Sequence, residues 1–372
     1  MILLSRGGNQ HVEYINHLKS KLSKLIFLEI NKEVLAENFN IPELRKSRED
    51  LFLPLSPEYI AENINKDLTK HLPFGEFVKG MYYVAGADPS FNQIPVYREL
   101  LVSLHRETVI KGLVAKLIGE DKQEEGLVYL LGLFTIHGEK DVLKNLLVLL
   151  EELSVKESMY QQALLRYADT AIEQELLEGH LFKGSALRFA GNFSQSLFHL
   201  REYLRLGGEE TKEITEEMEF LDRKARITEG EAILYENPER FLELVLPLLS
   251  LEEDNPKLLL MIAIAYRMLE NHDKALYYLN DALAVDQTYV DVLNEMGINY
   301  AAIGNYEEAV TYFHKLFSEV RTIEILTNLI MCYINMGNLE QARKHIEIGE
   351  LIDSEDEILL EIKNYMRKLE QK

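Results

Sequence analysis

Residues 293–317, LNEMGINYAAIGNYEEAVTYFHKLF, contain the pattern that decides the fold. The first apolar positions are spaced as on one face of a helix, namely Leu293, Met296, Gly297 and Tyr300. Gly304 and Asn305 interrupt this face, because glycine accepts the left-handed conformation of a helix end and asparagine caps a following helix. A second apolar face begins at Ala309. The stretch therefore predicts two helices joined by a tight turn.

The same two-helix pattern occurs three times in residues 256–355. Each copy starts its second apolar face on a small residue, with spacings of 34 and then 33 residues: Ala275, Ala309 and Ala342. Each copy also ends its first apolar face on a tyrosine: Tyr266, Tyr300 and Tyr333. A unit that recurs at this spacing cannot bury its apolar face alone, so it stacks on its neighbours. The last third of the chain is therefore predicted to be a stack of helical hairpins.

This pattern resembles the tetratricopeptide repeat (TPR). Besides the tyrosines and alanines, the matching positions are a small residue in the first helix and a large one late in the second: Ala263, Gly297, Leu279, Phe313 and Ile346. The chain departs from the family in having no Trp, in lacking the late proline, and in placing the bulky Ile330 where a small residue is usual. The resemblance, clear over residues 256–355, implies an all-α fold, a right-handed α-solenoid of stacked helix-turn-helix hairpins.

Three segments are predicted along the chain. Residues 1–120 form a mainly helical N-terminal region, in which the apolar runs Ile2–Leu4 and Leu25–Leu28 are candidates for two short strands. Residues 121–254 hold degenerate TPR-like hairpins, including one with the turn Gly191-Asn192 and the same internal spacing as the later repeats. Residues 255–372 hold the three TPR units and a last helix that caps the stack.

Capping residues mark several helix boundaries. Two Asn-Pro pairs, at 237–238 and 255–256, each combine a cap residue with proline at the first helical position. Ser354 precedes Glu357 by the spacing of a capping box, which predicts the start of the last helix. Its apolar side is predicted to contain Ile358, Leu359, Ile362 and Met366. Residues 210–237 are predicted to form one long helix supported by charge pairs at i, i+4.

The composition limits the classes of partner and compartment. A formal net charge of −22 argues against nucleic-acid binding, because phosphates attract positive surface. The charge suits basic partners, or it merely solvates outer helix faces, which is the preferred interpretation. The single cysteine, Cys332, cannot form an intramolecular disulfide and is predicted to be a buried packing residue. No apolar run is long enough for a membrane span or a secretory signal, so we predict a cytoplasmic protein without membrane contact.

The sequence holds no motif that carries catalysis. It has no glycine-rich phosphate loop, HExxH, CxxC, EF-hand loop or GxSxG. Its ten histidines are scattered without the spacing of metal ligands. We therefore predict no enzyme activity, no cofactor and no metal site. An enzyme with an unrecognised site in the N-terminal region would need a pocket that gathers residues such as Asp88, His71, Tyr82 or Arg98.

Residues 32–41, KEVLAENFNI, offer a competing hypothesis. They are similar to the first helix and turn of a helix-turn-helix, a domain that some peptide-sensing regulators join to TPR units. Residues 1–120 would then be the effector region of a peptide- or ligand-controlled regulator. However, Pro42 falls where the recognition helix should begin, and acidic residues such as Glu43 would face phosphate. A short packing helix is therefore the preferred interpretation.

The TPR resemblance implies that the first helix of each unit lines a concave face that binds peptides. In the first unit, the positions that face this groove are Lys257, Leu260, Ile264, Arg267 and Met268. In the second unit they are Asp291, Asn294, Ile298, Ala301 and Ala302. In the third unit they are Glu324, Thr327, Met331, Ile334 and Asn335.

These positions also predict the kind of partner. Family members that clamp a terminal carboxylate use several basic residues here, whereas this groove offers Lys257 and Arg267 together with two acids, so we do not expect that clamp. An apolar surface with polar edges suits an amphipathic helix or an extended apolar peptide. Alternatively, the N-terminal region or a neighbouring subunit fills the groove. The leading hypothesis is a non-enzymatic scaffold or adaptor for protein–protein interaction.

Overall fold

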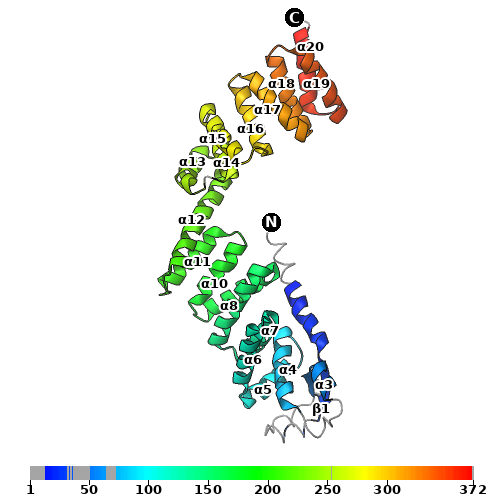
Figure 1. Cartoon of the computed structure of the whole chain (residues 1–372), viewed down its shortest axis with the longest axis vertical. Coiled ribbons are helices and arrows are strands. Elements are labelled where there is room, and N and C mark those ends of the chain that lie inside the picture. The colour runs from blue at the N-terminus through cyan, green and yellow to red at the C-terminus, as the bar shows by residue number, and fades with distance from the viewer. Residues whose placement is uncertain are drawn as a thin grey trace. The chain divides into compact units, whose positions relative to one another are not determined.

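The computed structural model is mostly helical (Figure 1). It describes residues 13–31, 33, 36, 51–63, 73–252 and 254–370. Contacts between Cα atoms divide the chain into two compact units, Met1–Asp222 and Arg223–Lys372. The boundary lies inside helix α12 (Lys212–Ile233). The division into three segments remains a prediction, and each unit is described here by itself.

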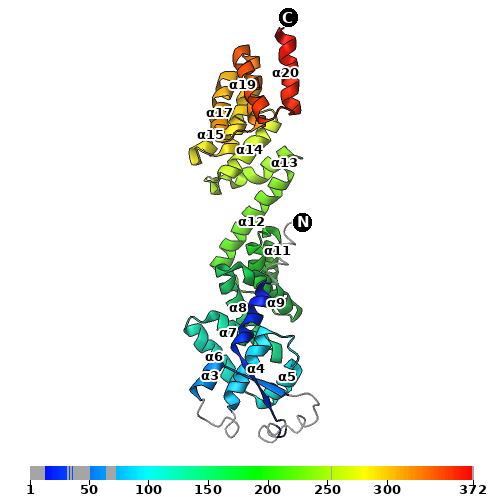
Figure 2. The same cartoon turned by 90° about the vertical axis from the view of Figure 1, so that its right-hand side faces the viewer.

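A short antiparallel sheet stands near the start of the first unit. Strand β1 (Ile26–Ile30) pairs with β2 (Leu51–Leu55), and β2 packs on helix α4 (Phe74–Ala87) (Figure 2). The sequence did not reveal β2, because Pro54 interrupts a run that otherwise reads as a strand. The other predicted strand, Ile2–Leu4, lies outside the described residues, as does most of the stretch proposed as a helix-turn-helix.

The rest of the first unit is helical. Its further helices before α12 are α3 (Pro57–Glu62), α5 (Ile94–Leu104), α6 (Glu107–Gly119), α7 (Gln123–His137), α8 (Lys140–Lys156), α9 (Gln161–Glu173), α10 (Glu178–Phe189) and α11 (Phe193–Arg205). Helix α6 packs on α7, α8 on α9, and α10 on α11, which gives three consecutive hairpins. In the last of them, Gly191 has a positive φ of 73° and the side chain of Asn192 accepts a hydrogen bond from the backbone N–H of Gln195. This is the turn that the degenerate repeat predicted.

Helices α4 and α7 touch backbone to backbone. A Cβ atom added to Gly132 would lie 2.0 Å from the carbonyl oxygen of Tyr82, and one added to Gly86 would lie 1.8 Å from that of Val128. No side chain fits between the helices at these two points, because real Cβ contacts are much longer. The crossing therefore depends on glycine in both helices.

Glu124 in α7 fastens the helical segment at residues 13–24 to the unit. Lys21 Nζ lies 2.6 Å from Glu124 Oε2, and the Tyr160 hydroxyl donates a hydrogen bond to Oε1 at 2.8 Å. His17 Nε2 lies 3.3 Å from the same carboxylate. Burial alone would raise the pKa of Glu124, but the hydrogen bonds from Lys21 and Tyr160 and the charge of Lys21 outweigh it and lower the pKa to about 2.

We expect Glu124→Gln to weaken this attachment and to reduce the acid sensitivity of the first unit. Because the folded pKa lies below the ordinary value of 4.5, the contact stabilises the fold above that pH and is lost as the pH falls toward about 2. Urea unfolding of the parent chain and the variant, at pH values from about 7 to about 3, measures how much of the free energy of unfolding each loses on acidification. Glu152→Gln is the control, since the described residues give Glu152 no cationic partner. Equal pH dependence in both variants would contradict the prediction.

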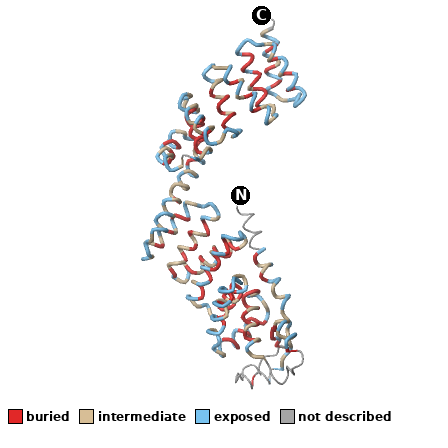
Figure 3. Tube along the Cα trace, in the orientation of Figure 1, coloured by how far each residue is buried: buried red, intermediate tan, exposed pale blue. Residues whose placement is uncertain are grey.

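The second unit contains the three predicted TPR hairpins. After α12 come α13 (Pro238–Val245), the 3₁₀ helix η4 (Leu246–Leu251), α14 (Pro256–Met268), α15 (His272–Val285), α16 (Val290–Ala302), α17 (Tyr306–Glu319), α18 (Ile323–Asn335), α19 (Leu339–Ile352) and α20 (Glu357–Glu370). The pairs α14/α15, α16/α17 and α18/α19 pack as hairpins, and each hairpin packs on the next. Buried residues lie on the facing sides of the helices (Figure 3). The all-α solenoid of TPR-type hairpins is thereby confirmed.

The repeated small and aromatic residues form the contacts within and between these hairpins. The three alanines that start the second apolar faces are fully buried: Ala275, Ala309 and Ala342. The ring of Tyr266 stacks on Tyr278 with centroids 5.6 Å apart, and Tyr300 stacks on Tyr312 at the same separation. In the third unit a histidine takes the place of the second tyrosine, and the rings of Tyr333 and His345 lie 5.1 Å apart. The periodicity in the sequence thus corresponds to one packing arrangement used three times.

The turns within the hairpins differ in one residue. Gly304 and Gly337 have positive φ angles of 78° and 74°, and the residue at the same place in the first hairpin, Glu270, has a φ of 58°. The asparagine that follows each of them caps the second helix through its side chain. A residue with a Cβ atom is strained in this left-handed conformation by about 1 kcal/mol.

We expect Glu270→Gly to stabilise the second unit by about 0.5 to 1 kcal/mol, because glycine removes this strain at some cost in the entropy of the unfolded chain. Gly304→Ala introduces the same strain into the next hairpin and should destabilise it by about 1 kcal/mol. Thermal unfolding of the two variants and the parent chain measures both changes. A lower stability for Glu270→Gly would show that the side chain contributes a contact that outweighs the strain.

The last helix, α20, closes the apolar end of the third hairpin, but two details of its prediction were wrong. Its cap is Asp356, whose Oδ1 accepts a hydrogen bond from the backbone N–H of Leu359 at 2.7 Å, because the helix begins at Glu357. Ser354 therefore lies before the cap. Leu359, Ile362 and Met366 are buried, whereas Ile358 is exposed.

Candidate functional site

Five predicted groove residues meet in one hollow of the second unit. Lys257, Leu260 and Ile264 of α14 and Asn294 of α16 line a cavity of about 340 Å³. Asp291, at the start of α16, lies at the same hollow. The structure thus places the first helices of two neighbouring units around a common space.

The end of α12 and the residues after it supply a third wall. Glu231, Leu234 and Tyr235 line the hollow, and Tyr235 is 68% exposed. They were not among the predicted site residues, because residues 210–237 were predicted to form one long helix supported by charge pairs. One signal could have revealed them: the Asn-Pro pair at 237–238 opens a new helix, so residues 234–236 lie in the turn before it.

The floor of the hollow is apolar and largely covered. Leu260 and Ile264 are buried, and so is Met261, to which the sequence gave no groove role. Tyr289, just before α16, is half-buried and adds an aromatic ring to the lining. A ligand would therefore meet the edges of these side chains rather than a broad apolar face.

Both cations predicted in the groove have carboxylate partners. Lys257 Nζ lies 2.6 Å from Glu231 Oε1. Arg267 binds Glu295 through two hydrogen bonds, Nε to Oε2 at 2.7 Å and Nη2 to Oε1 at 3.2 Å. Asp291 is exposed and has no hydrogen bond or ion pair within the described residues. The unneutralised charge at the hollow is therefore negative.

The other ten predicted groove residues do not line this hollow. Arg267 is held by its ion pair, and Ile298 is half-buried on α16. Thr327 and Ile334 of α18 are buried, because neighbouring helices cover this part of the first helix. The exposed members of the set are Met268, Ala302, Glu324, Met331 and Asn335.

Three of the residues named for an alternative catalytic site each have a different partner in the first unit. Tyr82 OH lies 2.6 Å from His137 Nε2, Asp88 pairs with Lys19, and the Arg98 guanidinium donates to the carbonyl oxygen of Thr135. His71 lies outside the described residues. Among residues that the structure describes, no three His, Cys, Asp or Glu side chains are grouped to hold a metal ion.

Two further predictions concern burial and membranes. Cys332 is buried, and burial raises the pKa of its thiol to about 11, as expected for a packing residue. In the described ranges, no helix has both the length and the apolar character needed to cross a bilayer.

Comparison with known proteins identifies similar solved structures. No protein-family model matches the sequence, and no match was found among the curated proteins. The crystal structure of MamA is 16% identical over 48% of this chain and 92% of MamA, with a TM-score of 0.37. TTC0263, a thermophilic TPR protein of Thermus thermophilus, is 19% identical over 52% of this chain and 97% of its own, with a TM-score of 0.33. YrrB, a TPR protein with an unusual peptide-binding site, is 16% identical over 68% and 97%, with a TM-score of 0.29.

Proposed function

We propose that this protein is a non-enzymatic scaffold that binds a peptide or a partner helix along the first helices of residues 256–355. The observation that carries the proposal is the hollow between α12, α14 and α16, because five of its lining residues occupy predicted groove positions. An apolar floor with a few polar groups at its edge is usual for peptide-binding sites. The exposed Met331 and Asn335 on α18 would extend the contact.

The charges of the groove favour one kind of partner. Lys257 and Arg267 are already paired with carboxylates, so they do not favour a terminal carboxylate or a nucleic acid. Asp291 favours a peptide that brings a basic residue beside its apolar ones. We therefore infer that the ligand is an amphipathic helix or an extended apolar segment. We further propose that the protein works in the cytoplasm, without a cofactor and without membrane contact.

We expect Tyr235→Asp to weaken peptide binding by about tenfold or more, because it removes an exposed aromatic wall and adds a charge to the hollow. The test uses a peptide selected from a random library on the full chain, with affinities measured by calorimetry. Tyr277→Asp is the matched control, since Tyr277 is 60% exposed on α15 and does not line the hollow. If the two variants bind the selected peptide equally well, the groove assignment fails.

A further inference from the structure

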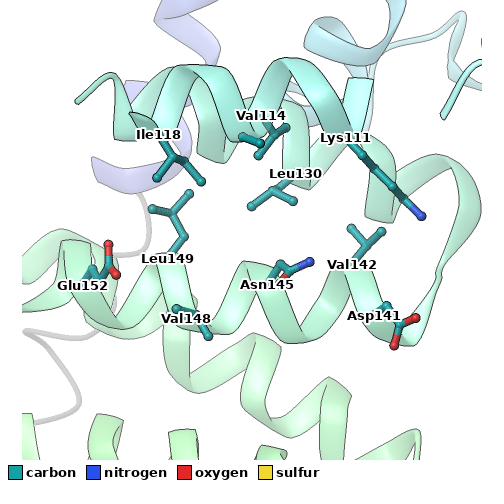
Figure 4. A pocket seen from close by; sticks show the side chains of 11 residues that line it. Lys111, Val114, Ile118, Leu130, Asp141, Val142, Asn145, Val148, Leu149 and Glu152 are labelled. Atoms are coloured by element: carbon teal, nitrogen blue, oxygen red, sulfur yellow. The ribbon is translucent and has the colours of Figure 1, made fainter. Parts of the chain in front are cut away.

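A second hollow lies in the first unit, between α6 and α8. Its volume is about 400 Å³. Side chains of the two helices point toward each other across it, and Leu130 of α7 lies between them (Figure 4). The lining is mostly aliphatic, with Val114 and Ile118 from α6 and Val148 and Leu149 from α8.

The hollow exists because its two walls are held apart. Helices α6 and α8 each pack on α7, but they scarcely touch each other. By contrast, α8 packs directly on α10, the first helix of the following hairpin. Val148 is 47% exposed and Ile118 is 38% exposed, one on each wall. The walls therefore form an apolar groove that has room for a further element.

The charges at the two ends of this groove are negative. Lys111 lines it but pairs with Glu139 at 2.6 Å. Asp141 has no hydrogen bond or ion pair in the part of the chain that the structure describes, and Glu152 accepts a hydrogen bond only from the side-chain amide of Gln123, at 3.1 Å. Along α8, Asp141 and Glu152 are separated by about 16 Å, which is three helical turns.

We propose that the groove between α6 and α8 docks an amphipathic helix of a partner protein, with an apolar stripe about three turns long and a Lys or Arg at each end of the stripe. The carboxylates of Asp141 and Glu152 meet these basic residues, and the aliphatic walls receive anchors at i, i+3 or i+4, and i+7. A helix fits better than an extended peptide, because the groove walls are helices with no free backbone groups to pair with a strand. The proposal does not depend on the peptide groove of the second unit.

The test uses the full chain and a labelled helical peptide of about 15 residues, with leucine anchors at this spacing and arginine at both ends. A second peptide replaces the arginines by glutamate. In fluorescence anisotropy we expect the arginine peptide to bind about tenfold or more tightly than the glutamate peptide. Val148→Asp should weaken binding of the arginine peptide by about tenfold or more, because it places a charge on the apolar wall.

Val109→Asp is the matched control for charge. Val109 is 54% exposed on α6 and does not line the groove, so this variant adds the same carboxylate to the same unit elsewhere. It should change the affinity by less than about twofold. Equal effects of the two variants, or no binding of the arginine peptide, would overturn the proposal. So would light scattering in which Val148→Asp converts a dimer of the full chain into monomers, because the groove would then be a contact between copies.

Discussion

Gly132→Ala is expected to destabilise the first unit by about 4 kcal/mol, although it adds a single methyl group to a helix. Alanine normally favours a helix over glycine by about 1 kcal/mol, so the sign is opposite to the usual effect. The added Cβ atom would lie 2.0 Å from the carbonyl oxygen of Tyr82, which belongs to the backbone of α4. Since a backbone cannot swing aside as a side chain does, the two helices must separate, and overpacking of this severity is among the largest effects of single substitutions.

Hydrogen exchange of the full chain measures this effect in α4 and α7, where slow amides report the free energy of opening. Gly112→Ala is the matched control, because Gly112 lies within α6 and a Cβ atom added there meets nothing within 4 Å. We expect the free energy of unfolding of that variant to rise by about 0.5 to 1 kcal/mol, because alanine has the higher helix propensity. A similar gain for Gly132→Ala would show that α4 and α7 are not in backbone contact.

The repeat could be predicted from sequence because its causes are local. Ala275, Ala309 and Ala342 are small because a second helix crosses each of them closely, and the structure buries all three completely. The turns within the hairpins could be predicted in the same way, because a left-handed residue and an asparagine cap both have local sequence signals. Spacing, residue size and turn chemistry are all properties of a short stretch of chain, so the hairpins could be recognised without knowledge of their neighbours.

The walls of the two hollows could not be predicted in this way. Tyr235 lines the hollow together with residues of α14 and α16, and nothing in the charge pattern of α12 indicates that these helices lie beside it. Val148 and Ile118 stand on different helices, and their hollow depends on how far α7 holds those helices apart. Such distances result from tertiary packing between elements, which local periodicity does not encode.

The second large effect concerns Arg267, which the sequence places at a groove position. In the structure this residue pairs with Glu295, which lies in the first helix of the next hairpin. The side chain of Glu295 is 10% exposed and that of Arg267 is 29% exposed, so the pair is mostly shielded from water. Its first role is therefore to join two hairpins.

Arg267→Met is expected to destabilise the second unit by about 3 kcal/mol, because it leaves the carboxylate of Glu295 buried without its partner. Arg267→Met with Glu295→Met removes both charges, and we expect the double variant to be more stable than the single one, since no unpaired charge remains in the interface. Urea unfolding of the parent chain, both single variants and the double variant gives the coupling energy. If the losses of stability in the two single variants add up to the loss in the double variant, the two side chains contribute separately. Arg267 would then be free to bind a ligand.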